Sequence, residues 1–126
     1  MKVFFMGTPE FALVSLERLY CSCHRVTGVL TAPDRPQGRG LKVQPSPVKR
    51  FALEKGLPIF QPSSLPDSDL LAFLDREKPD AIVVVACGLK IPKILLDLPR
   101  YGCINLHASL LPKYRGASPI RAALLN

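Results

Sequence analysis

The stretch Ala81-Ile82-Val83-Val84-Val85-Ala86-Cys87 is the most strongly apolar part of this 126-residue chain, and it decides the fold class. β-branched residues of this kind favour strands. Because apolar side chains fill successive positions rather than alternate ones, both faces of the strand must be covered. The stretch therefore predicts a central parallel strand in an α/β domain.

Segments of strand and helix character alternate on both sides of this strand. Strands are predicted over residues 2–6, 25–31, 57–60 and 101–106, and helices over residues 10–20, 48–56, 67–78, 91–98 and 118–126. The 101–106 strand is expected to be buried. This alternation predicts an α/β, Rossmann-like three-layer fold with a mostly parallel sheet.

The helix predicted over residues 10–20 has Phe11, Val14, Leu16 and Leu19 at helical spacing. Thr8 is expected to cap this helix, and Pro9 to be its first residue. Proline is tolerated there because the N–H group at that position makes no hydrogen bond within the helix. Only one glycine, Gly7, lies where a dinucleotide-binding motif has three. The opening therefore does not predict NAD binding.

A segment of different character follows the second strand. Residues 32–47 contain four prolines, two glycines and three cations, Arg35, Arg39 and Lys42, with a single acid. Such a composition predicts irregular structure. A basic loop of this length can contact phosphates and position a nucleic acid. A solvated insertion or an interdomain linker remain the alternatives for this 33–45 loop.

The composition of the chain limits the classes of partner and of compartment. The formal net charge of +7 favours an anionic partner, with nucleic acid first. No apolar run is long enough to span a bilayer or to form a signal-peptide core, so a cytoplasmic protein is expected. No metal is expected, because Cys21-Ser22-Cys23-His24 stands without a second ligand cluster. Cys87 and Cys103 are expected to be buried thiols.

The strand predicted over residues 101–106 ends in polar residues. Asn105 and His107 lie two positions apart, so their side chains point the same way from an extended backbone. In a parallel sheet, ligands bind at the carboxyl ends of the strands, where the 7–9 turn, the 33–45 loop and the 87–89 loop also fall. An imidazole and a carboxamide there suit acyl transfer to an amine. A structural histidine is the alternative.

The same residues carry a resemblance to a known family. Asn105-Leu106-His107-Ala108-Ser109-Leu110-Leu111-Pro112-Lys113-Tyr114-Arg115-Gly116 resembles the signature of the formyl-tetrahydrofolate-dependent formyltransferases. The opening Phe5-Met6-Gly7-Thr8-Pro9-Glu10-Phe11-Ala12 and the loop Pro33-Asp34-Arg35-Pro36-Gln37-Gly38-Arg39-Gly40 resemble the branch whose formyl acceptor is initiator methionyl-tRNA. The resemblance covers essentially the whole chain.

The resemblance implies a donor, an acceptor and roles for particular residues. Asn105 and His107 match two catalytic residues, which would stabilise the tetrahedral oxyanion and shuttle protons. The residues matching the formyl-tetrahydrofolate pocket are Val85, Ala86, Cys87, Gly88, Leu89, Ser109, Leu110, Leu111 and Pro112. Those expected to contact the tRNA are Arg35, Arg39, Lys42, Thr8 and Pro9. The full-length enzyme is expected to be a monomer, with no metal and no membrane partner.

The chain departs from the family pattern after its last predicted helix. The family's third catalytic residue, an aspartate, lies downstream of the histidine, and this chain ends at Asn126. Residues 1–126 are therefore expected to be the N-terminal portion of a catalytic domain, truncated at the C-terminal side and without a C-terminal tRNA-binding barrel. Little activity is expected of them alone. A sibling enzyme with a small-molecule amine as acceptor, or a non-catalytic folate- or RNA-binding module, are the alternatives.

Overall fold

A computed structural model describes residues 1–37, 40 and 42–106 of the chain. The helices are α1 (Glu10–Tyr20), α2 (Pro47–Lys55), α3 (Ser68–Glu77) and α4 (Lys93–Leu96). The strands are β1 (Lys2–Gly7), β2 (Arg25–Leu30), β3 (Arg35–Gln37), β4 (Lys42–Gln44), β5 (Ile59–Phe60), β6 (Ala81–Val85) and β7 (Cys103–Leu106). The predicted alternation of strands and helices is confirmed.

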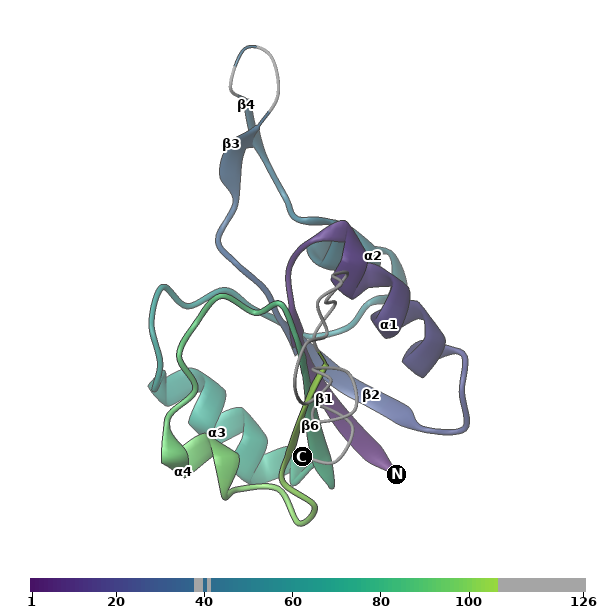
Figure 1. Ribbon diagram of the computed structural model, residues 1–126, viewed down its shortest axis with the longest axis vertical. Coiled ribbons are helices and arrows are strands. Elements are labelled where there is room, and N and C mark those ends of the chain that lie inside the picture. The colour runs from purple at the N-terminus through teal and green to yellow at the C-terminus, as the bar shows by residue number, and fades with distance from the viewer. Residues whose placement is uncertain (38–39, 41, 107–126) are drawn as a thin grey trace, which may run out of the picture.

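Five strands form one parallel sheet in the order β5-β2-β1-β6-β7. Helices α1 and α2 cover one face of this sheet, and α3 and α4 cover the other (Figure 1). The α/β, three-layer, mostly parallel architecture is therefore confirmed. Strand β6 lies between β1 and β7, as its apolar run predicts, and all five of its residues are buried.

The alternation of side chains along the strands builds two separate cores. Val3, Phe5 and Val83 point toward α1 and α2, where they pack with Leu16 and Ala52. On the other face, side chains such as Phe4, Met6, Ile82 and Val84 pack with Leu70, Phe73 and Leu74 of α3. Successive residues of β1 and β6 thus serve opposite cores, which is why neither strand shows an alternating polar pattern.

Gly7, at the end of β1, allows α1 to approach the sheet closely. A Cβ atom added to Gly7 would lie 2.6 Å from the carbonyl oxygen of Val85 and 2.8 Å from the Cβ of Ala12. No side chain fits in that space. The glycine therefore sets the closest contact between α1 and the carboxyl end of the sheet.

The prediction of irregular structure for residues 32–47 is wrong for residues 35–37 and 42–44, which are strands, and for Pro47, which begins α2. Strands β3 and β4 pair antiparallel, with Arg35 opposite Gln44 and Pro36 opposite Val43. Each strand of a two-stranded ribbon has a free edge, where the missing N–H group of a proline is tolerated. Figure 1 shows this ribbon, the β3–β4 arm, extending away from the sheet.

Two expectations for the start of α1 are also wrong. The N-cap is Pro9, and no side chain caps the helix. The Thr8 hydroxyl instead accepts a hydrogen bond from the Ala32 amide at 3.1 Å, which ties the end of β1 to the end of β2. Phe11 and Val14 are exposed, and Ala12 and Leu16 are the residues that α1 buries. The tight contact at Gly7 selects the small Ala12 side chain for the buried face.

Two elements near the end of the described chain differ from the sequence expectation. Strand β7 lies at the edge of the described sheet, and its residues are half-buried or exposed rather than buried. Cys103, on this strand, is accordingly half-buried, whereas the expectation that Cys87 is buried is confirmed. Helix α4 has four residues, fewer than predicted. The helix predicted over residues 118–126 lies outside the described residues.

Candidate functional site at the carboxyl end of the sheet

The loop that follows β6 has an unusual backbone. Ala86 has a positive φ of 51° and Gly88 has a φ of 84°. The left-handed region is unfavourable for alanine, and such strain is found most often at functional sites. Between them, Cys87 turns its side chain inward and remains buried. The loop therefore presents its backbone, rather than side chains, at the carboxyl end of the sheet.

Two cavities open on opposite sides of this loop and share Ala86, Cys87 and Gly88. The first, of about 330 Å³, lies toward the arm and is also lined by residues of the β1, β2 and β4 ends: Thr8, Pro9, Ala32, Pro33, Arg35, Gln44, Ser46 and Pro47. The second, of about 420 Å³, lies toward β7 and is also lined by Val84, Leu89, Ile91, Leu96 and Asn105. Four strand ends therefore meet around one loop.

Asn105 is the polar side chain that β7 contributes to the second cavity. It pairs in register with Val84 of β6 and is exposed to solvent. The other lining side chains, such as Leu89, Ile91 and Leu96, are apolar. A carboxamide beside an apolar wall can donate a hydrogen bond to a negative oxygen where little water competes with it.

A cluster of hydroxyl groups lies beside the first cavity, which Thr8 and Ser46 line. The Thr31 and Ser46 hydroxyl oxygens lie 2.6 Å apart, which joins the end of β2 to the start of α2. Ser46 also caps α2 by accepting a hydrogen bond from the Lys49 amide. The helix predicted over residues 48–56 thus begins at Pro47, directly after this cap.

Asp34 forms an ion pair at the root of the arm. The Lys49 ammonium lies 3.1 and 3.0 Å from the two Asp34 carboxylate oxygens, and the Gln61 amide donates to the same carboxylate at 2.9 Å. These hydrogen bonds, that of Gln61 first, lower the pKa of Asp34 below 3.8. The carboxylate is therefore ionised at neutral pH, and protonation would weaken the cluster only in strong acid.

The thiol of Cys87 is kept protonated by its surroundings. Burial raises its pKa, partly opposed by a hydrogen bond from the Leu89 backbone. A thiol of this kind is a poor nucleophile, so it acts as a small apolar group between the cavities. No group of three histidine, cysteine or carboxylate side chains in the described part of the chain is arranged to hold a metal ion.

The structure brings together many of the predicted site residues but not all. Thr8, Pro9 and Arg35 line the first cavity, Leu89 and Asn105 line the second, and Ala86, Cys87 and Gly88 line both. Lys42 is exposed on the arm, and Val85 lies fully buried in the core beneath α1. His107, Arg39, Ser109, Leu110, Leu111 and Pro112 lie outside the described residues.

Sequence reasoning missed the roles of Asp34, Lys49 and Gln61. Asp34 is the single acid within a basic segment, which is a signal that it has a specific cationic partner. Lys49 and Gln61 come from different elements, α2 and the segment after β5, so no spacing rule joins them to Asp34.

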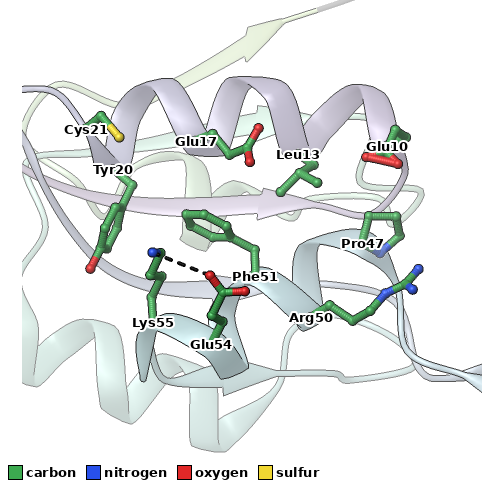
Figure 2. Close-up of a pocket in the computed structure, with 10 residues that line it drawn as sticks. All are labelled: Glu10, Leu13, Glu17, Tyr20, Cys21, Pro47, Arg50, Phe51, Glu54 and Lys55. Carbon is green, nitrogen blue, oxygen red and sulfur yellow. Dashed lines mark ion pairs between the residues drawn. The ribbon is translucent and has the colours of Figure 1, made fainter.

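A larger cavity, of about 520 Å³, lies elsewhere, in the groove between α1 and α2 (Figure 2). At one end Lys55 lies over the rings of Tyr20 and Phe51 and pairs with Glu54 at 3.5 Å. The groove runs along the outer helices rather than across the strand ends. We place the candidate site at the two smaller cavities, because ligands of parallel sheets bind at the carboxyl ends of the strands.

Comparison with known proteins gives the family. The model of the formyl transferase family matches residues 1–126, and the chain belongs to this family. A methionyl-tRNA formyltransferase of Methylobacillus flagellatus is 56% identical over 125 residues, which are 99% of this chain and 41% of that protein. One of Alkaliphilus oremlandii is 53% identical over 126 residues, 100% of this chain and 41% of that protein. The chain thus spans about two-fifths of the length of these relatives.

A solved structure supports the fold assignment. Glycinamide ribonucleotide transformylase 1 of Geobacillus kaustophilus superposes with a TM-score of 0.58 and 22% sequence identity, over 97% of this chain and 65% of that one. Similarity at this level of identity concerns the arrangement of strands and helices. In the described part of the chain, no helix is long and apolar enough to cross a membrane.

Proposed function

We propose that this chain carries the catalytic site of an enzyme that transfers the formyl group of formyl-tetrahydrofolate to the α-amine of methionyl initiator tRNA. The observation that carries the proposal is the position of Asn105 in a cavity that shares the 86–88 loop with a second cavity at the root of a basic arm. Donor and acceptor would enter from opposite sides of that loop. The names of the 53–56% identical relatives support the same acceptor.

In the proposed reaction, the amine nitrogen attacks the formyl carbon and the carbonyl oxygen becomes an oxyanion. The Asn105 carboxamide donates a hydrogen bond to this oxyanion. His107 accepts the proton that the amine loses and passes a proton to the folate nitrogen as the bond between that nitrogen and the formyl carbon breaks. The products are formyl-methionyl-tRNA and tetrahydrofolate.

The donor side of the site suits a folate for two reasons. The second cavity has an apolar wall formed by Leu89, Ile91 and Leu96, against which a flat ring can pack. The strained loop at Ala86 and Gly88 offers backbone groups for hydrogen bonds to such a ring. We propose that formyl-tetrahydrofolate binds here and that no metal takes part.

The acceptor side of the site suits an RNA. Arg35 and Lys42 lie on the β3–β4 arm, and Arg35 also lines the first cavity. Cations on an extended ribbon contact phosphates without requiring a particular base. A small amine would fit the cavity without an arm, so the arm favours a tRNA over a small-molecule acceptor.

Acceptor choice tests the proposal. We would join residues 1–126 to the remainder of the Methylobacillus flagellatus relative, and we call this protein the full-length chimera. With formyl-tetrahydrofolate as donor, we expect the chimera to formylate methionyl-tRNA and to leave glycinamide ribonucleotide unchanged. Formylation of the ribonucleotide alone would support the sibling enzyme instead. Binding of tRNA and folate without transfer to either acceptor would support the non-catalytic module.

The cations of the arm give a separate prediction. In the full-length chimera, Arg39→Ala should raise the KM for methionyl-tRNA about ten-fold, since a lost phosphate or base contact costs about 1–3 kcal/mol. The KM for formyl-tetrahydrofolate should stay within about two-fold, because the contact proposed for this residue is with the tRNA. The two KM values are measured from initial rates. Arg18→Ala, at a cation of α1 outside both cavities, is the matched control. An equal rise in both KM values would contradict the proposed role of the arm.

A further inference from the structure

Side-chain contacts, in addition to the two chain connections, join the base of the β3–β4 arm to the rest of the domain. Asp34 immediately precedes β3. Its carboxylate pairs with the Lys49 ammonium of α2 at 3.0 Å and accepts a hydrogen bond from the Gln61 amide at 2.9 Å. The Gln61 amide also donates to the Ala32 carbonyl at 3.0 Å. Helix α2 and the segment after β5 therefore both hold Asp34, the residue that leads into the arm's first strand.

The two stems of the arm are the residues that lead into β3 and those that follow β4. The second stem also contacts the start of α2. Beyond β4, Ser46 meets Thr31 at 2.6 Å and caps α2 through the Lys49 amide. Lys49 thus takes part on both sides, since its backbone binds the second stem and its ammonium binds the first. Both stems of the arm are therefore held by the same turn of α2.

We propose that Asp34, Lys49 and Gln61 form a clamp that fixes the direction of the β3–β4 arm and so positions the acceptor RNA over the strand ends. The inference rests on the proposed function, and it assigns these three side chains as positioning residues. An arm that extends from the body multiplies any small rotation at its root into a large displacement at its cations (Figure 1). Misplacement of a reacting group by about 1 Å can lower a rate about 100-fold, so a fixed root matters.

The direction in which one substitution changes the KM for methionyl-tRNA distinguishes the clamp from simple charge attraction. Asp34→Ala removes a negative charge from a basic arm, so attraction to phosphates alone would make tRNA bind more tightly. The clamp requires the opposite result, because the arm loses its restraint. We expect the KM for methionyl-tRNA to rise about five-fold, a modest change because the ion pair is partly exposed. The KM for formyl-tetrahydrofolate should not change.

Substitutions at Lys49 provide a second test of the clamp. Lys49→Met should raise the same KM value, whereas Lys49→Arg keeps the ion pair and should restore it. Lys55→Met is the matched control, since Lys55 is also a lysine of α2 paired with a carboxylate, about 9 Å further along the helix. It should leave both KM values unchanged.

The rate of trypsin cleavage, measured without RNA, reports directly on how firmly the clamp restrains the arm. Lys42 is exposed on β4, so trypsin can cut after it. In the full-length chimera, Asp34→Ala should speed cleavage after Lys42 about five-fold, because a loosened arm opens more often. Lys55→Met should not change this rate.

The two measurements distinguish failure of the clamp from failure of the proposed function. Faster cleavage in a chimera that transfers no formyl group would contradict the proposed function and support the restraint. Transfer with unchanged cleavage, or a lower KM for methionyl-tRNA in Asp34→Ala, would overturn the clamp.

Discussion

Replacing Asn105 by alanine in the full-length chimera should lower kcat for formyl transfer about 100- to 1,000-fold. Loss of one preorganised oxyanion donor has an effect of this size, because the donor acts on charge that exists only in the transition state. The KM values should change little, since the carboxamide is not required for ground-state binding. The measurement is the initial rate at saturating donor and acceptor.

Asn105→Asp is the informative companion to this variant. An aspartate has nearly the same shape, but when ionised it accepts hydrogen bonds and adds negative charge beside the oxyanion. It should be at least as impaired as Asn105→Ala. An Asn105→Asp variant that keeps full kcat would show that this side chain does not stabilise an oxyanion.

Replacing Gly7 by alanine should destabilise the fold by about 3 kcal/mol, the upper end of the usual cost of overpacking. The added Cβ would meet the Val85 carbonyl oxygen of β6 at 2.6 Å and the Ala12 side chain of α1 at 2.8 Å. Relief of these clashes requires β6 to shift from β1 and α1 to shift from the sheet. Forced overpacking of this kind costs about 1–3 kcal/mol, and contact with backbone is the costly case. The thermal unfolding midpoint of the full-length chimera should fall by about 6–12 °C.

Gly56→Ala is the matched control for Gly7→Ala. Gly56 ends α2 with a φ of 70°, and nothing lies within 4 Å of the position of its missing Cβ. The same substitution there meets backbone strain without any clash, and should cost about 1 kcal/mol. A smaller effect at Gly7 than at Gly56 would contradict the account of the α1 contact.

The sheet was predictable because its signals are local. The apolar run at residues 81–85 and the helix at residues 48–56 each depend on neighbouring residues, and both are predicted from the sequence. The grouping of the strand ends followed from the parallel topology alone. The strand-end position of Asn105 at the candidate site could be anticipated in the same way.

The errors arose where contacts distant in sequence decide the structure. Helix α1 has apolar residues on most sides, so spacing could not identify its buried face, and the contact with Gly7 does. Pro36 argued against a strand, yet an isolated two-stranded ribbon accepts it. The clamp joins Asp34 to Lys49 and Gln61, which lie 15 and 27 positions away, and no sequence pattern links them.

The central claim is that the strand ends around the 86–88 loop and Asn105 form a centre for formyl transfer to methionyl-tRNA. The most direct measurement is the initial rate at which the full-length chimera transfers a labelled formyl group from formyl-tetrahydrofolate to methionyl-tRNA. We predict a rate within about ten-fold of the Methylobacillus flagellatus parent, a difference below about 1.4 kcal/mol. A chimera that unfolds at the parent's temperature, yet transfers no faster than its own Asn105→Ala, His107→Ala double variant, would contradict the claim.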